Sequence, residues 1–416
     1  MNTLAILALL TLTAALFGWI SVRWLRLPLT VGTMLLTAIA AGLLSGVGAL
    51  LPQVHQWTAD RVGQIDFEAV ILHGMLPLLL FAGAFLLDID ELEREAFAVT
   101  LFSLAGTVLA FLAVAGLMAL VAGRGIPWIE LLLFGALISP TDPIAVLEML
   151  RRTGVPKPIE AQLAGESLFN DGIGAVLFLT VLEIARGHAP TLGQVAWLLI
   201  LKAGGSVVVG IGAAWATSHL MRRVDSYQVE ILLTIALALG GYVLADSLQL
   251  SAPLEAVVAG IALRHCNRRQ PAECFSEARV DSFWEVFDEI QNALLFVLLG
   301  LETTVVSLNA PALRQGWAAI CSVNIARMAV VVLLLSIVRL TKRGHPGSRA
   351  LLTWGGLRGG LSIALALSVP QNFGRNWILS ATCLTVAFSI LVQGGSMEAL
   401  LRWRQRRELR ITDAGE

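Results

Sequence analysis

Two aspartates of this 416-residue chain lie deep inside apolar stretches: Asp142 within SPTDP and Asp171 within GESLFNDG. An aspartate at the centre of a membrane-spanning helix costs on the order of 3 kcal/mol, and such residues pair with one another or mark the path of an ion or a proton. Asp142 and Asp171 are therefore the first candidates for chemistry.

The residues around Asp142 favour cation binding. Pro140 and Pro143 bracket Thr141 and Asp142, and each proline removes a backbone donor and leaves carbonyls of the preceding turn without a partner. Free carbonyls, the Thr141 hydroxyl and the Asp142 carboxylate are hard oxygen ligands, which suit a small cation.

The residues around Asp171 follow helical spacing. Glu166 and Asn170 are four residues apart, as are Ser167 and Asp171, so each pair shares a stripe of the helix. Glu166 and Asp171 point about 140° apart and are expected to have different partners.

Two arginines also fall inside apolar stretches. Arg358 cannot lose its proton and requires an anion, so we assign Glu166 as its partner in a structural ion pair and leave Asp171 to exchange protons. Arg327 is expected to play a structural role, with a carbonyl or a helix end as its partner.

The composition predicts that lipid surrounds most of the chain. Hydrophobic residues make up 56% of it and charged residues 14%, against about 25% charged in a soluble domain. The N-terminal apolar run has no basic residues before it and is about 20 residues long, so we interpret it as a membrane span rather than a signal peptide. Thirteen apolar stretches are predicted to span the membrane: 3–22, 27–50, 68–87, 97–121, 129–151, 159–185, 192–218, 228–247, 251–264, 283–301 (amphipathic at its start), 315–338, 348–370 and 375–401.

Loop charges predict the orientation. Most of the 29 Lys and Arg residues fall in one alternating set of loops and in the basic tail 402–416. Basic loops stay in the cytoplasm, which places the C-terminus there and the N-terminus outside.

The thirteen stretches form one membrane domain, 1–401. Six of them, at 3–185, are predicted to form one repeat, and six more, at 228–401, a second repeat of inverted topology. A linking helix at 192–218 joins the two repeats. The stretches 129–151 and 348–370 then correspond. Both are interrupted, the first by SPTDP (139–143) and the second by GGLRGG (355–360). Paired interruptions indicate the binding site of a transporter.

The motifs SPTDP, GESLFNDG, GGLRGGLSIALALSVP and LPLLLFAGAFLLD resemble those of bacterial sodium/proton antiporters of the NhaP type, in the cation:proton antiporter 1 family. The resemblance implies an all-α homodimer with broken fifth and twelfth helices in the cell (inner) membrane, working in pH homeostasis. It implies electroneutral exchange, because Asn170 precedes the key aspartate. It places ion binding on Asp171, Asp142, Ser167, Thr141 and Asn170, and the buried ion pair on Glu166 and Arg358.

Two positions depart from that family pattern. Ala82 stands where some members carry a glutamate in the third helix, which leaves the choice among Na⁺, K⁺ and Li⁺ open. Glu255 stands where a small residue is expected, either at the end of its helix or on the ion path.

The expected mechanism is competition of a proton and a Na⁺ ion for Asp171 and Asp142, because burial favours the neutral form of a carboxylate and a bound cation the charged form. No cofactor and no nucleic acid partner are predicted. The alternatives are an intramembrane aspartyl protease, whose Tyr-Asp and Gly-x-Gly-Asp signatures are absent from the sequence, and a cation channel, for which no filter motif is present.

Overall fold

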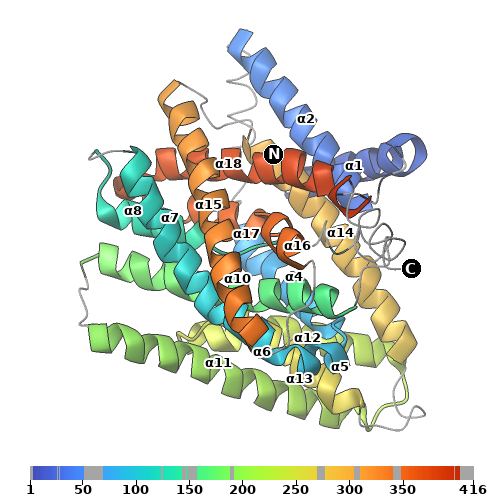
Figure 1. Ribbon diagram of the computed structural model, residues 1–416. Coiled ribbons are helices and arrows are strands. Elements are labelled where there is room, and N and C mark those ends of the chain that lie inside the picture. The colour runs from blue at the N-terminus through green and yellow to red at the C-terminus, as the bar shows by residue number, and fades with distance from the viewer. Residues whose placement is uncertain are drawn as a thin grey trace, which may run out of the picture.

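The computed structural model describes residues 3–25, 27, 29–50, 69–122, 125–142, 147, 157–187, 192–268, 277–303, 310–340, 348–397 and 399–402. Within these ranges the regular secondary structure is entirely helical (Figure 1). Pro143, most of the second half of 129–151 and nearly all of the predicted tail lie outside them.

The helices are, in chain order, α1 (Thr3–Ile20), α2 (Leu29–Leu50), α4 (Leu76–Phe85), α5 (Ile89–Arg94), α6 (Ala96–Thr100), α7 (Thr107–Ala122), α8 (Trp128–Ile138), α10 (Lys157–Ala185), α11 (Leu192–Met221), α12 (Tyr227–Ser247), α13 (Ala252–Arg268), α14 (Glu277–Thr303), α15 (Ala310–Leu340), α16 (Ser348–Trp354), α17 (Gly360–Leu367) and α18 (Arg375–Phe388). Short π-helical turns extend several of them, among them Ala69–Met75 before α4 and Leu101–Gly106 before α7.

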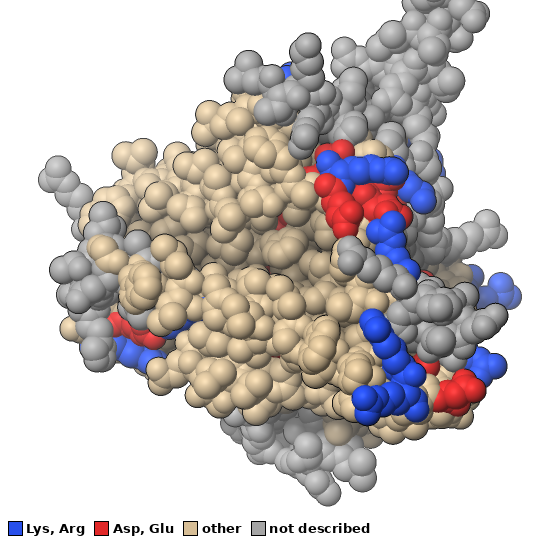
Figure 2. Space-filling view, turned by 90° about the horizontal axis from the view of Figure 1, so that it is seen from below, with Lys and Arg blue, Asp and Glu red and all other residues tan. Residues whose placement is uncertain are grey.

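The chain is a multi-pass membrane protein. Each of the thirteen predicted stretches contains helix, and seven helices of the described residues are long and apolar enough to cross a bilayer by themselves. Figure 2 shows the charged side chains gathered at opposite edges of one face, with a broad band of uncharged residues between them. Such a band fits the hydrocarbon layer, which excludes charge.

Two helices are interrupted where the sequence predicts it. The helix α8 ends at Ile138, and Pro140 to Asp142 are not helical. The helices α16 and α17 are separated by a non-helical segment, 355–359. Pro140 explains the first end because it lacks an N–H donor, and the glycines on both sides of Leu357 and Arg358 allow the second.

The packing of one half recurs in the other. The third helix of the first half, α4, packs against α13, which is the second helix of the second half. In the same way α14, the third helix of the second half, packs against α2. The fourth helices, α7 and α15, contact each other, and so do the interrupted helices at α8 and α17. Such exchanged contacts are those that two repeats of inverted topology make.

Close packing around α13 depends on small residues. A Cβ on Gly260 would lie 2.8 Å from the Phe81 carbonyl oxygen and 2.7 Å from Ala84 Cβ, so only glycine lets α13 approach α4 this closely. Small residues serve the same purpose at helix interfaces in membranes generally. The tight seam fixes α4 at the side of the candidate site.

Candidate functional site

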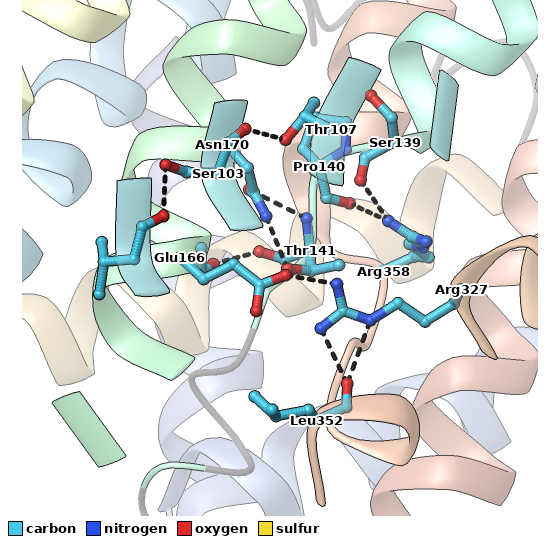
Figure 3. A network of polar contacts seen from close by, with 12 residues as sticks. Ser103, Thr107, Ser139, Pro140, Thr141, Glu166, Asn170, Arg327, Leu352 and Arg358 are labelled. Carbon is cyan, nitrogen blue, oxygen red and sulfur yellow. Dashed lines mark hydrogen bonds and ion pairs between the residues drawn. The ribbon is translucent and has the colours of Figure 1, made fainter. Parts of the chain in front are cut away.

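The end of α8 is held by side chains of α10 (Figure 3). The Thr141 N–H donates to Asn170 Oδ1 at 3.1 Å, and Asn170 Nδ2 donates to Thr141 Oγ1 at 2.8 Å. The Ser167 hydroxyl donates to the Thr141 carbonyl oxygen. The N–H and the carbonyl oxygen of Thr141 in the interrupted segment therefore both have hydrogen-bond partners on α10. These partners, Asn170 and Ser167, are three residues apart and so lie on one face of that helix.

The two interrupted segments touch at Asp142. Its N–H donates to the Leu357 carbonyl oxygen at 2.8 Å, which joins the break after α8 to the break before α17. A Cβ on Gly359 would lie 2.0 Å from Asp142 Oδ2. Glycine is therefore required there, because any side chain would displace the Asp142 carboxylate.

Arg358 caps the broken end of α8. Its Nη1 donates to the Ser139 carbonyl oxygen at 2.5 Å and to the Pro140 carbonyl oxygen at 2.7 Å. The last carbonyls of a helix lack partners and carry partial negative charge. The guanidinium of Arg358 supplies both hydrogen-bond donors and positive charge to these carbonyls. Arg358 is itself buried, with 2% of its surface exposed.

Arg327 of α15, rather than Arg358, forms the buried ion pair with Glu166. Its Nη1 contacts Glu166 Oε1, while Nε and Nη2 donate to the Leu352 carbonyl oxygen at 3.1 and 2.8 Å. The predicted pair of Glu166 with Arg358 is thus corrected, because the Arg358 hydrogen bonds go to backbone carbonyls. The helix-end partner expected for Arg327 is the Leu352 carbonyl, near the end of α16.

The two aspartates line one cavity of about 210 Å³. Thr141 and Ser167 line it as well, so four of the predicted ligand residues meet at its wall. Asn170 and Glu166 do not line this cavity; Asn170 instead positions Thr141 through the two bonds above. Carboxylates, hydroxyls and backbone carbonyls at one cavity wall can replace part of the hydration shell of a monovalent cation, and the carboxylates can take up protons.

Ala82, where the resemblance implies a missing glutamate, does not line the cavity. The cavity face of α4 carries Leu79, Leu80 and Gly83. Ala82 is fully buried in a different cluster, with Phe81, Phe85 and Trp284. Because successive residues of a helix are about 100° apart, an error of one residue in the register moves a side chain off the cavity.

Glu255 is fully buried at the start of α13, but it is not part of the cavity wall. A Cβ on Gly241 of α12 would lie 2.2 Å from its Oε1. Neither carboxylate oxygen has a hydrogen-bond partner among the described residues. The Glu255 carboxylate therefore lies against Gly241 of α12, outside the wall of the cavity that Asp171 lines.

The cavity has a polar wall on α14 that the sequence analysis did not identify. Asp288, Glu289 and Asn292 are among its lining residues. The signal in the sequence was the amphipathic start of 283–301, where acidic residues interrupt an apolar run at helical spacing. Such spacing indicates a helix with one polar face.

Known proteins share the sequence and the fold. The family model for the transmembrane sodium/hydrogen exchanger matches residues 11–403. The chain is 40% identical to the Na(+)/H(+) antiporter NhaP of Pseudomonas aeruginosa over 93% of both chains, and 32% identical to the Na(+)/H(+) antiporter NhaH of Halobacillus dabanensis over 81% of this chain and 83% of that one. The structure of the sodium proton antiporter MjNhaP1 from Methanocaldococcus jannaschii at pH 8 superposes with a TM-score of 0.72 at 20% identity, covering 94% of this chain and 98% of the other. The contact between two interrupted helices beside two half-buried aspartates thus occurs in a chain that belongs to the sodium/hydrogen exchanger family.

Proposed function

We propose that this chain is a secondary transporter that exchanges Na⁺ for H⁺ across the membrane by competition at Asp171 and Asp142. The observation that carries the proposal is the single cavity in which both carboxylates meet Thr141 and Ser167, beside two interrupted helices. The family match and the named activities of the relatives support it.

The competition follows from the shared wall. A proton on Asp171 removes the charge that attracts a cation, and a cation beside Asp171 opposes protonation. Ser167 and Thr141 supply neutral oxygens that replace water molecules around the cation. The carboxylates share one cavity, so the charge of one affects proton and cation binding at the other, and Asp171 carries the exchanged proton.

The cavity opens toward the cytoplasm in this conformation. On α10 the lining residues run from Ala164 to Asp171, and on α14 from Asp288 to Leu295. Both helices begin at the basic loops that the charge pattern assigns to the cytoplasm, with the N-terminus outside. Of the lining residues of α14, Glu289 is exposed and Asp288 half-buried, which supports an open end on that side. Alternating access then moves the site to the other side by rocking one bundle against the other.

The chain works as a homodimer in the cell (inner) membrane, and its exchange is electroneutral. The amide of Asn170 supports the last point, because it is neutral and engaged with Thr141. Only one carboxylate, Asp171, follows it in the motif, so one proton is expected to exchange for one Na⁺.

The test uses everted membrane vesicles in which an acidified lumen is monitored by a fluorescent dye. Adding Na⁺ to vesicles with the wild-type chain restores the luminal pH, whereas Asp171→Asn abolishes the response. Asp246→Asn, which removes an exposed carboxylate on α12, serves as the matched control and keeps the response. Wild-type exchange by Asp171→Asn would overturn the assignment.

The choice of cation is measured with the same vesicles. A series of Na⁺, Li⁺ and K⁺, repeated with the membrane voltage clamped by an ionophore, gives the preference and the charge balance together. Faster recovery on clamping would contradict electroneutral exchange.

A further inference from the structure

Glu255 is a carboxyl inside the helix bundle that the proposed exchange does not use. It lies in the first turn of α13, it is fully buried, and it is not part of the cavity wall that Asp171 and Asp142 share. Neither of its carboxyl oxygens has a hydrogen-bond partner among the residues that the structure describes. Such a group is costly in its ionised form, because an unpaired charge loses its hydration when it is buried.

The start of α13 does not stabilise a charge on Glu255. The N–H groups at the start of a helix attract anions, but here they bond to Ser251. Leu254 N–H donates to Ser251 Oγ at 3.4 Å, and Glu255 N–H donates to the Ser251 carbonyl oxygen at 3.0 Å. Pro253 has no N–H to offer. Ser251 is itself fixed to the linking helix α11, because its N–H donates to Ser206 Oγ at 2.9 Å.

The carboxyl group of Glu255 packs on the backbone of α12. A Cβ on Gly241 would lie 2.2 Å from Oε1, 2.8 Å from Cδ and 2.9 Å from Oε2. On the side of α11, a Cβ on Gly210 would lie 3.0 Å from the Glu255 carbonyl oxygen. Glycine on both neighbours therefore makes room for Glu255 where α11, α12 and α13 meet. The surface that the carboxyl contacts on α12 carries no charge.

The charged groups of the neighbouring helices have other partners. The helix α13 packs against α4, α5, α10, α11 and α12, and α4 has no titratable residue. Those of the other four helices and of α13 itself are Asp90, Glu91, Glu93, Arg94, Lys157, Glu160, Glu166, Asp171, Glu183, Lys202, His219, Tyr227, Glu230, Tyr242, Asp246, Arg264, His265, Cys266 and Arg268. Each Lys and Arg of this list pairs with a carboxylate other than Glu255. Within the described chain, none of these side chains hydrogen-bonds to the Glu255 carboxyl.

We propose that Glu255 binds a proton of its own, which is not exchanged for Na⁺ and which keeps α13 packed against α12. A protonated carboxyl is neutral, so it can remain inside the bundle where an unpaired carboxylate cannot. Its oxygens are closed off and lie outside the wall of the ion cavity, so the proton has no direct path to Asp171. The inference goes beyond the proposed exchange and does not depend on it.

Loss of this proton would reach the ion cavity through α13. Leu254 precedes Glu255 and packs on α10, where a Cβ on Gly172 would lie 3.1 Å from Leu254 Cα. Gly172 directly follows Asp171. An ionised Glu255 must gain water or a cation, which requires α12 and α13 to part. The helix α13 then loses its fixed position beside α10, so exchange is expected to need a neutral side chain at position 255.

The direct test is infrared difference spectroscopy of the purified chain in proteoliposomes at neutral pH and saturating Na⁺. Under the proposed competition, saturating Na⁺ displaces protons from Asp171 and Asp142. The spectrum of the wild type minus that of Glu255→Gln is expected to show the C=O band of one protonated carboxyl. Asp246→Asn, at an exposed position of α12, is the matched control and keeps this band. Glu255→Met replaces the glutamine variant if that variant does not assemble.

A second measurement is the pH dependence of denaturant unfolding in mixed micelles. In the unfolded chain a glutamate loses its proton above about pH 4.3, whereas the folded chain keeps the proton on Glu255. The unfolded state then binds fewer protons, so stability is greatest at low pH and falls as pH rises. Glu255 contributes a rise in the unfolding equilibrium constant of up to about tenfold per pH unit. This contribution is absent from Glu255→Gln and present in Asp246→Asn.

Three results would overturn the proposal: no protonated carboxyl band in the wild type, a band that remains in full in the Glu255 variant, or equal pH dependence of unfolding in the wild type and Glu255→Gln. Exchange by Glu255→Gln is expected to be retained, because its amide is neutral. An assembled Glu255→Gln chain without exchange would show that the proton on Glu255 is itself exchanged.

These failures are distinguishable from failure of the proposed exchange. If Asp171→Asn is inactive and the band is missing from the wild type, exchange at Asp171 stands and only the proton on Glu255 falls. If Asp171→Asn exchanges normally while the band is lost with Glu255, the proton on Glu255 stands and the exchange assignment falls.

Discussion

Asn170 and Thr141 are joined by two hydrogen bonds of opposite direction, with Thr141 N–H donating to Asn170 Oδ1 and Asn170 Nδ2 donating to Thr141 Oγ1. The side-chain amide thus substitutes for the helical partner that the proline-interrupted backbone has lost. Because Asn170 directly precedes Asp171 in α10, one turn of helix both fixes the unwound segment and presents the exchanging carboxylate.

Removing the Asn170 amide is expected to loosen the site without removing its carboxylates. Asn170→Ala loses both bonds, and at about 1 kcal/mol each the free energy of unfolding falls by about 2 kcal/mol. The maximal exchange rate falls with it, because Thr141 is no longer fixed. The checks are denaturant unfolding in mixed micelles and exchange in vesicles.

Asn376→Ala, at an exposed position of α18, is the matched control. If Asn170→Ala matches this control in both its free energy of unfolding and its exchange rate, Asn170 does not position Thr141.

A double-mutant cycle can establish which arginine pairs with Glu166. Arg327→Met leaves Glu166 buried without its partner, which costs about 3–5 kcal/mol. Adding Glu166→Gln then recovers much of the loss, because the uncompensated charge is gone. The free energy of unfolding of the two single variants and the double variant gives the coupling energy.

The same cycle with Arg358→Met is the comparison. Because the Arg358 hydrogen bonds go to the Ser139 and Pro140 carbonyl oxygens, Glu166→Gln should recover less of that loss. A larger coupling of Glu166 with Arg358 than with Arg327 would reverse the pairing.

Gly359→Ala is expected to abolish exchange in a protein that still assembles. The added Cβ would lie 2.0 Å from Asp142 Oδ2, so the carboxylate must move away from the cavity wall. The measurement is Na⁺-dependent recovery of luminal pH, together with the amount of chain in the membrane.

Gly116→Ala provides the control, since nothing lies within 4 Å of a Cβ at that position of α7. Wild-type exchange by Gly359→Ala would show that Asp142 need not stay in its place beside Gly359.

Competition for one site predicts how exchange depends on pH. Where the site is mostly protonated, a fall of one pH unit should raise the apparent KM for Na⁺ about tenfold if one proton is displaced per cation. The maximal rate changes less, because saturating Na⁺ displaces the proton. The measurement is a set of Na⁺ titrations across pH in proteoliposomes buffered equally on both sides.

The slope of the logarithm of the apparent KM against pH decides between the mechanisms. A slope of magnitude near zero would contradict competition, and a magnitude of two would indicate two displaced protons, in conflict with electroneutral exchange. Asp142→Asn in the same titrations shows whether the second carboxylate contributes to the slope.

The parts of the site that the sequence predicts are those with a local signature. Asp142 and Asp171 stand out because charges are rare in apolar stretches, and Pro140 marks the end of α8 by chemistry within its own turn. The partner of Glu166 has no such signature. Arg327 and Arg358 both lie inside apolar stretches, and the choice between them depends on how α15 and the 355–359 segment pack around α10, which spacing along one helix does not report.

The register of helices α4 and α14 explains the other differences between the predicted and the observed site. Ala82 and Gly83 are adjacent in sequence, yet Gly83 lines the cavity and Ala82 packs in the cluster with Trp284. Asp288 and Glu289 are visible in the sequence as charges near the start of a weakly apolar stretch. Their place at the wall of the cavity that Asp171 lines depends on the contacts of α14 with α2, α1 and α4.

The exchanged packing of α4 with α13 and of α14 with α2 has a consequence for biosynthesis. Tyr242 donates to the Leu72 carbonyl oxygen across 170 residues of sequence, and the buried face of α4 is completed by helices that leave the ribosome long after it. The first six spans must therefore wait in the lipid with an unfinished interface. Insertion into the bilayer and assembly of the ion path are separate events in time, and the aspartates meet their final surroundings only when the last helices arrive.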